Sequence, residues 1–269
     1  MDKIILKWFD ILEFPTEWKN ATIEAIKTFN LEEIEAQDAP YSWLFEQENK
    51  MTGMLYALYK CEEFFNNGLK KGISQDILID TLQEIRRHSQ NYYKYNQIIG
   101  LYQIKWAEVI LSGRLYCLGR LEFEMRTTQK TWEKGGIITP GASVLSVHIP
   151  RTGGSMTDEE CEESFVRSKE FFKKYFPDFD YKCYFCHSWL LDPTLQKFLK
   201  PESNIIKFQN RFDITETHES ASGLGIIFGG GTTYENVLEK TPQTSLQKAA
   251  YDYIKNGGKL LDGYGFIKK

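Results

Sequence analysis

The chain has 269 residues, 42% hydrophobic and 14% aromatic, which is enough for one large globular domain or two modest ones with a buried core. It carries 33 basic and 37 acidic residues, a formal net charge of -4, and no long block of like charge. This balance argues against nucleic acid or an anionic membrane surface as a partner.

Export and membrane insertion are not expected. Lys7 and Asp10 interrupt the apolar run at the N-terminus, which breaks the core that a signal peptide needs. Later apolar stretches fall short of the roughly 20 residues of a membrane span. The five cysteines, an odd number, are expected to be reduced thiols. We therefore expect a cytoplasmic protein.

The first third of the sequence has the apolar spacing of helices. Helices are predicted over residues 16–29, 51–67, 74–88 and about 98–111, with Thr16 and Ser74 as caps. The pattern changes at Gly113. We predict a helical N-terminal domain over residues 1–112 and a second domain over residues 113–269.

Residues 114–125 alternate as a half-buried strand does. Arg120, Glu122 and Glu124 share one face of this predicted strand. They are expected to form a solvated face with a cross-strand ion pair. The functional alternative is that Glu122 acts as a general base, directly or through water.

Residues 143–191 form the most recognisable unit of the sequence. They read as a strand (143–150), a Gly-rich loop (151–156), a helix (157–176) and a second strand (181–191). Thr157 and Glu160 have the spacing of a capping box, which fixes the helix start. Two strands joined by such a helix are expected to be parallel.

The loop before this helix has two interpretations. The amides of Gly153, Gly154, Ser155 and Met156 precede the positive end of the helix dipole, where a phosphate could be held. The alternative is a plain connection whose helix is capped by its own acidic residues.

The rest of the chain is predicted to be mixed. We expect a short helix over residues 193–199, strands over residues 203–214 and 224–229, and a final short strand over residues 263–267. Thr244 and Gln247 form a second capping box, and the helix that they open is expected to end at Gly257.

Histidines and cysteines gather in the two strands of the central unit. His148 and His187 lie toward the carboxyl ends, where ligands bind in open α/β sheets. Cys183 and Cys186 form a CxxC pattern, but on a strand their side chains point to opposite faces. With no second CxxC or histidine pair to complete a zinc site, we expect structural cysteines and no metal.

Several segments resemble the bacterial acyltransferase-domain-containing family, a GNAT-like (N-acetyltransferase-like) group with a helical N-terminal domain. They are residues 115–124, 147–150, 186–199, 203–212 and 244–258. The resemblance implies an α+β fold: a helical domain followed by a mixed, mostly antiparallel sheet with one parallel, splayed strand pair and flanking helices.

The resemblance also implies a site for acetyl-CoA or another acyl-CoA. The pantetheine arm would lie between the splayed strands, and the pyrophosphate over residues 151–156. Arg151, Gly154 and Met156 fill the family's loop pattern, although Met156 departs from its usual Gly or Ala. The residues expected to hold the cofactor are Val147, His148, Ile149, Arg151, Gly153, Gly154, Ser155 and Met156.

The implied activity is transfer of an acetyl or short acyl group to the amine of a small molecule or peptide. We expect His187, then Glu122, to transfer the proton, with Ser188 as a further candidate. One rival is a non-catalytic protein that keeps the fold to bind CoA, an acyl group or a protein. Another is a thiol-redox or metal protein built on Cys183 and Cys186. The helical part, rich in Trp and Tyr, would shape the acceptor pocket or form a homodimer interface.

Overall fold

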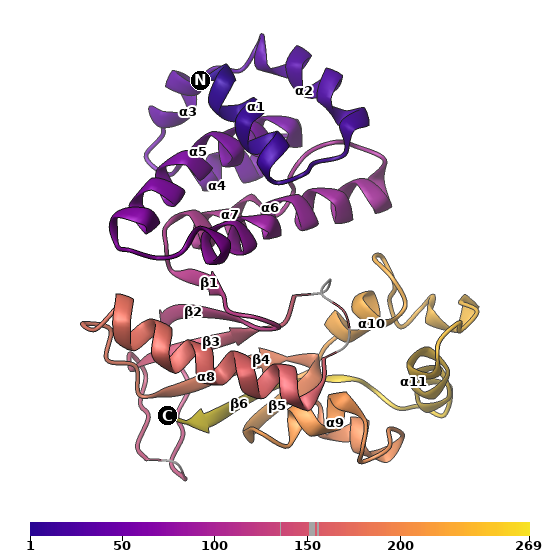
Figure 1. The fold of residues 1–269 in the computed structure, drawn as a ribbon. Helices are drawn as coiled ribbons and strands as arrows, with labels where there is room; N and C mark the ends of the chain where they lie inside the picture. The colour runs from indigo at the N-terminus through magenta and orange to yellow at the C-terminus, as the bar shows by residue number, and fades with distance from the viewer. Residues whose placement is uncertain (135, 151–153, 155) are drawn as a thin grey trace. The chain divides into compact units, whose positions relative to one another are not determined.

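The structure is a computed structural model that describes residues 1–134, 136–150, 154 and 156–269. Its described residues divide into two compact units, Met1–Leu118 and Gly119–Lys269 (Figure 1). In sequence, this division falls close to the predicted boundary between residues 112 and 113. Among the described residues, every helix is too short or too polar to span a membrane.

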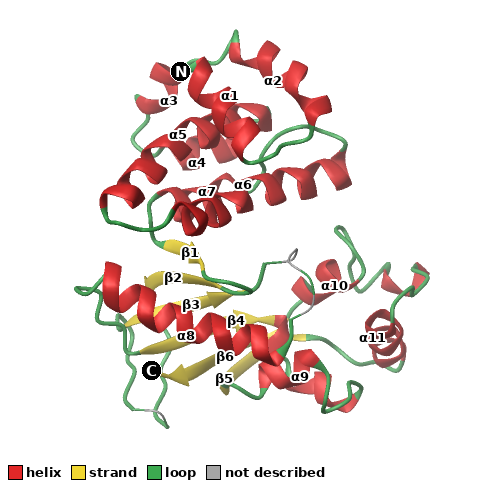
Figure 2. Cartoon of the chain, in the orientation of Figure 1, coloured by secondary structure: helices red, strands yellow, loops and turns green. Residues whose placement is uncertain are grey.

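The first unit is helical, as predicted (Figure 2). Its helices are α1 (Asp2–Ile11), α2 (Lys19–Ile26), α3 (Leu31–Glu35), α4 (Pro40–Glu46), α5 (Lys50–Lys70), α6 (Gln75–Asn96) and α7 (Ile104–Leu111), with the 3₁₀ turn η1 (Thr16–Trp18) before α2. The short strand β1 (Leu115–Cys117) ends the unit. Helices α1, α3 and α4 were not predicted. The helix predicted over residues 74–88 continues to Asn96 and stops at Gln97, which is left-handed, and the helix predicted from about residue 98 begins only at Ile104.

α5 forms the centre of the first unit. α1, α6 and α7 pack against it, and its inner side buries Met54, Leu58 and Phe64. Trp8 of α1 donates its indole N–H to the carboxylate of Glu62 at 2.7 Å. This bond satisfies the one polar atom of a side chain that is otherwise fully buried.

The second unit is built on a mixed sheet. Its strands follow the order β2-β3-β4-β6-β5, and only β3 and β4 are parallel. Their bounds are β2 (Glu122–Thr127), β3 (Ser143–His148), β4 (Cys183–Ser188), β5 (Asp213–Glu219) and β6 (Leu261–Lys268). The predicted fold class, including the single parallel pair, is therefore confirmed.

α8 (Asp158–Tyr175) connects β3 to β4 and packs on one face of the sheet (Figure 1). Phe165 of α8 meets Phe123 of β2 and Tyr184 of β4 edge-on, with ring centroids 5.6 and 4.9 Å away. The hydroxyls of Ser168 and Tyr184 lie 2.8 Å apart and satisfy each other. This aromatic layer is the core between α8 and the sheet.

The opposite face of the sheet carries polar groups over part of its area. The strand registers place Glu122, His148 and His187 on this side. Trp132 covers another part of it and stacks on Phe266 of β6, with centroids 5.3 Å apart and planes inclined by 4°. Its indole N–H donates to Asp213 at 2.7 Å, which anchors the segment that leads from β2 to β3.

Short helical elements follow β4. They are η2 (Trp189–Leu191), η3 (Pro193–Lys197), α9 (Asn204–Gln209), α10 (Ser222–Ile227), η4 (Val237–Glu239) and α11 (Ser245–Lys255). The capping box of Thr244 and Gln247 at α11 is confirmed. The strands predicted over residues 203–214 and 224–229 are wrong: α9 occupies half of the first, with β5 beginning only at Asp213, and α10 lies at the second.

The strand predicted over residues 114–125 is also corrected. It breaks at Gly119, whose φ of +93° is left-handed and whose missing Cβ would lie 2.9 Å from the hydroxyl oxygen of Ser164. Arg120 therefore leaves the strand. Glu122 and Glu124 are only 2% and 5% exposed, so the predicted solvated face is wrong.

Candidate functional site

The parallel strands β3 and β4 separate toward their carboxyl ends. Paired residues are Leu145 with Tyr184 and Ser146 with Phe185. Both strands continue, to His148 and to Ser188, beyond the last described pair. Two strands that diverge in this way leave room for a ligand between them, at the end of the sheet where α/β folds bind ligands.

A cavity of about 320 Å³ opens at this divergence. It is lined by Arg120, Val147, His148, Ile149, Pro150, Gly154, Met156, His187, Ser188, Trp189, Leu190, Ile205, Ile226 and Leu246. Five of the predicted cofactor residues and the predicted His187 and Ser188 are thus brought together. Of the other predicted residues, Arg151, Gly153 and Ser155 lie outside the described residues, and Glu122 is not among the lining residues.

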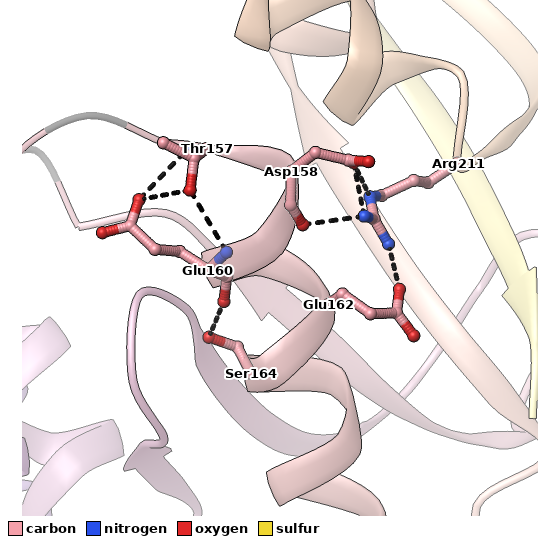
Figure 3. A network of polar contacts seen from close by, with 6 residues as sticks. All are labelled: Thr157, Asp158, Glu160, Glu162, Ser164 and Arg211. Carbon is pink, nitrogen blue, oxygen red and sulfur yellow. Dashed lines mark hydrogen bonds and ion pairs between the residues drawn. The ribbon is translucent and has the colours of Figure 1, made fainter.

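The start of α8 is capped by its own side chains (Figure 3). Thr157 Oγ1 accepts from the Glu160 amide at 3.2 Å, and Glu160 Oε2 accepts from the Thr157 amide at 3.0 Å. The predicted capping box is confirmed. The hydrogen bonds from Thr157 lower the pKa of Glu160, so this carboxylate stays ionised at the helix start.

Arg211, from the turn between α9 and β5, reaches the same helix end (Figure 3). Its Nη2 donates to the backbone oxygen of Asp158 at 3.0 Å, and its Nε donates to the Asp158 carboxylate at 3.1 Å. Its Nη1 donates to Glu162 at 2.6 Å. One guanidinium therefore neutralises two carboxylates close to the cavity and ties α8 to the segment before β5.

Arg120, which was predicted to lie on a strand face, lines the cavity. Its amide donates to Ser164 Oγ at 2.9 Å, and its guanidinium Nη1 donates to the Pro150 carbonyl at 3.1 Å. Ser164 also accepts from the Leu121 amide at 3.3 Å. Ser164 of α8 therefore holds the turn that brings a cation to the cavity.

His187 stands at the end of β4, with its side chain 40% exposed. Its ring stacks on Tyr264 of β6 with centroids 4.1 Å apart, and its Nε2 lies 3.9 Å from Asp262 Oδ2. Burial lowers the pKa of His187, and the nearby His218 and Lys130 lower it further, while Asp262 opposes them. The neutral imidazole is therefore the favoured form.

The other predicted polar residues have partners of their own. Ser188 Oγ accepts from the Leu190 amide at 3.1 Å and so caps η2. His148 Nε2 lies 3.1 Å from Glu124 Oε2. Glu122 pairs with His148 in the register of β2 and β3, so the two residues lie on the same face of the sheet.

Cys183 and Cys186 are buried free thiols. Cys183 belongs to the apolar cluster around Trp132 and Phe266, whereas Cys186, three residues on, faces the other side of the sheet. Burial raises the pKa of both thiols to about 12. This environment suits packing and not thiolate chemistry.

A second, apolar cavity of about 550 Å³ adjoins the first. The two share Ile205 of α9 and Leu246 of α11 as lining residues. Neither residue was predicted to line a site: residues 203–214 were predicted as a strand, and Leu246 lies in the helix opened by Thr244, for which no ligand was predicted. Beyond them, the second cavity is lined by Phe198, Leu199, Lys200, Glu202, Ser203, Asn204, Ser245 and Ala249.

Comparison with known proteins gives one family and several solved structures. The model of the family described as GNAT-like C-terminal domain matches residues 115–267, which is more than half of the chain. No curated protein matches the sequence. The family match spans the sheet, α8 and the residues that line the cavity.

The solved structures that resemble the chain are acyltransferases. One, in complex with decanoyl-CoA and teicoplanin, is 21% identical with a TM-score of 0.76 and covers 97% of this chain and 86% of its own. Another, a mutant in complex with octanoyl-CoA, is 20% identical with a TM-score of 0.78 and covers 100% of this chain and 88% of its own. At this identity the similarity establishes the fold, over both units.

Proposed function

The chain belongs to the family with the GNAT-like C-terminal domain, and from this membership we propose that it is an acyl-CoA-dependent acyltransferase that acylates an amine. The observation that carries the proposal is the separation of β3 from β4 over a cavity lined by both strand ends. Two acyltransferases of similar fold bind decanoyl-CoA or octanoyl-CoA, which supports the same class of co-substrate here.

The cavity residues suggest how acyl-CoA is held. The backbone of Val147 to Ile149 offers hydrogen bonds to the pantetheine arm, as an added strand would use them. The pyrophosphate would lie at the loop before α8, near the positive end of the helix dipole. Arg120 adds a cation at the cavity wall. This part of the proposal includes Arg151, Gly153 and Ser155, which are predicted from the sequence to hold the cofactor at its pyrophosphate.

The reaction needs one proton acceptor and one oxyanion donor. The amine nitrogen attacks the thioester carbonyl, a C–N bond forms, the C–S bond breaks, and CoA leaves as a thiolate. His187 accepts the proton of the amine, because its imidazole lines the cavity. A backbone amide of β3 stabilises the oxyanion. The thiolate is then protonated by an acid of the site.

Ser188 and Glu122 have secondary roles in the proposed reaction. The Leu190 amide occupies an acceptor position of the Ser188 hydroxyl, so its proton remains available for donation into the cavity. Glu122 is buried and faces the same side of the sheet as His148, which does line the cavity. A role for Glu122 therefore runs through His148 or through water.

The acyl group is proposed to be longer than acetyl. The apolar second cavity begins at Ile205 and Leu246, where the first one ends. An alkyl chain that passes between these residues gains about 0.8 kcal/mol for each buried methylene. We expect octanoyl-CoA to react faster than acetyl-CoA, and Leu246→Trp to reverse this preference by closing the passage.

The first experiment is a thermal-shift titration with acetyl-CoA, octanoyl-CoA and free CoA. A ligand that binds only the folded chain stabilises it by about 2.7 kcal/mol at 100 times its dissociation constant. The matched variant changes Arg151 and Gly154 to Glu, which places negative charge where the pyrophosphate is proposed to lie. Stabilisation of the parent and not of the variant supports the site, whereas no response of the parent to millimolar ligand would falsify it.

A second candidate function is acyl-CoA binding without catalysis. Met156 favours it, since a side chain stands where the family has Gly or Ala at the phosphate. Release of free CoA thiol across a panel of amines separates the two functions. Binding without thiol release would establish the second candidate.

A further inference from the structure

Two histidines and one aspartate meet on the face of the sheet opposite α8. The register pairs His218 of β5 with Asp262 of β6, and it pairs His187 of β4 with Tyr264. Asp262 and Tyr264 lie two residues apart on β6, so they share a face. One ligand atom from each of His187, His218 and Asp262 lies within 4.8 Å of the other two.

Asp262 is buried and held in one orientation. It is 7% exposed; its Oδ2 accepts from the Ser220 hydroxyl at 2.9 Å, and its Oδ1 accepts from the Ser222 hydroxyl at 2.5 Å. Such outer hydrogen bonds are the ones that fix carboxylates at metal sites. A buried carboxylate also needs a positive group beside it.

No lysine or arginine supplies that charge to Asp262 within the described part of the chain, where its ion-pair partner is His187 at 3.9 Å. Lys130 lies over the Tyr264 ring at 4.0 Å, but its ammonium is paired with Glu216 at 2.7 Å. His187 and His218, and not a lysine or arginine, are therefore the groups beside the Asp262 carboxylate in the described part of the chain.

We propose that His187, His218 and Asp262 bind a divalent transition-metal ion of the zinc class. Two imidazole nitrogens and one carboxylate oxygen form a donor set that suits Zn²⁺, Co²⁺ or Ni²⁺, whereas Mg²⁺ and Ca²⁺ prefer oxygen ligands alone. Bonds of about 2.0 Å in a tetrahedron hold ligand atoms about 3.3 Å apart. The present spacing is close to this value, since each of the three ligand atoms lies within 4.8 Å of the other two.

A metal at this site would regulate the proposed transferase. This regulation rests on the proposed function, whereas the binding of the metal is independent of it. A metal on one nitrogen of His187 leaves the other as N–H, so the imidazole no longer accepts a proton. The His187 nitrogen that binds the metal cannot also accept the proton of the amine. Zinc is therefore expected to inhibit acyl transfer.

The test is a titration of the chelator-treated full chain with Co²⁺, followed by its visible d–d absorption and by displacement with Zn²⁺. We expect one equivalent to bind. His218→Ala and Asp262→Asn should each weaken Co²⁺ binding by at least about tenfold. His88→Gln removes a histidine from α6 and serves as the matched control. Melting temperatures of all variants establish that each is folded.

Three results overturn the proposal: absence of the d–d bands, binding that His218→Ala leaves unchanged, or loss of binding in His88→Gln equal to that in His218→Ala. Zinc inhibition is then measured relative to the metal-free rate of each protein, and it should be weaker in His218→Ala than in the parent. If the parent transfers no acyl group but still binds Co²⁺, the proposed function fails and the metal site stands.

Discussion

Tyr264 stacks on His187 across β4 and β6, with ring centroids 4.1 Å apart and planes inclined by 11°. The stack restrains the imidazole that we propose as the proton acceptor. An aromatic pair of this kind contributes about 0.5–1.5 kcal/mol. Tyr264→Ala should therefore lower kcat/KM for acyl transfer by about 2- to 10-fold.

Tyr264→Phe keeps the ring and is the matched control for this prediction. It should retain the rate of the parent. Melting temperatures distinguish loss of orientation from loss of fold. Equal rates for Tyr264→Ala and the parent would show that the stack does not position His187.

Ser164 joins α8 to the turn that carries Arg120. Its hydroxyl accepts from the amides of Arg120 and Leu121 and donates to the Glu160 carbonyl at 2.8 Å. Ser164→Ala leaves the buried Leu121 amide and the half-buried Arg120 amide without this acceptor, which costs about 1–3 kcal/mol. Urea unfolding should show that loss, and acyl-CoA should bind more weakly because Arg120 is less restrained.

The control for Ser164 is Ser245→Ala, at the exposed start of α11. It removes a hydroxyl of the same kind without orphaning buried amides. Unfolding free energies should match the parent. A loss in Ser245→Ala as large as in Ser164→Ala would count against the buried-amide explanation.

The central β3-α8-β4 unit was predictable because its signals are local. Alternation marks β3, and Thr157 with Glu160 marks the start of α8 whatever surrounds it. A helix that connects two neighbouring strands of one sheet favours their parallel pairing. The positions of His148 and His187 at the strand ends followed from the same unit.

The errors lie where local signals are weak. α9 spans only Asn204–Gln209, too few turns to reveal a helical period, and its buried residues Ile206 and Phe208 imitate the alternation of a strand. The burial of Glu122 is set by the surrounding tertiary structure, which alternation alone does not report.

The cluster of His187, His218 and Asp262 illustrates a different limit. The three residues come from β4, β5 and β6 and meet only because β6 lies between the other two strands. Strand order depends on long-range pairing. The spacing of the three residues along the sequence does not indicate the order of the strands.

Arg211 is expected to govern acyl-CoA affinity through charge. The first six residues of α8 carry five carboxylates, and Arg211 binds two of them, those of Asp158 and Glu162. Arg211→Gln should raise the acyl-CoA dissociation constant about 2- to 5-fold at low salt, because the phosphates then meet more negative charge. High salt should shrink the difference.

Lys169→Gln, on the exposed side of α8, is the control for Arg211. It removes one positive charge beyond the first turns of the helix. Calorimetric titrations at two salt concentrations compare the variants. An effect of Arg211→Gln that is independent of salt would point to a structural cause instead of a Coulombic one.

The buried thiols predict how stability depends on alkaline pH. Burial raises the pKa of Cys183 from an ordinary value of 9.0 to about 12. The unfolded chain therefore loses this proton first, so the free energy of unfolding is unaffected below about pH 9 and falls between pH 9 and about 12. One such thiol contributes a slope of about 1.4 kcal/mol per pH unit.

Cys183→Ala removes this slope and leaves a small cavity, whereas Val144→Ala leaves a cavity in the same apolar cluster and removes no titrating group. Both variants should be less stable than the parent at neutral pH. Above pH 9, the parent and Val144→Ala should lose stability in parallel, and Cys183→Ala should lose it more slowly. Urea unfolding over this range measures the slopes. A native chain whose Cys183 reacts readily with a thiol reagent at neutral pH would contradict the burial on which the prediction depends, and it would revive a thiol-based activity.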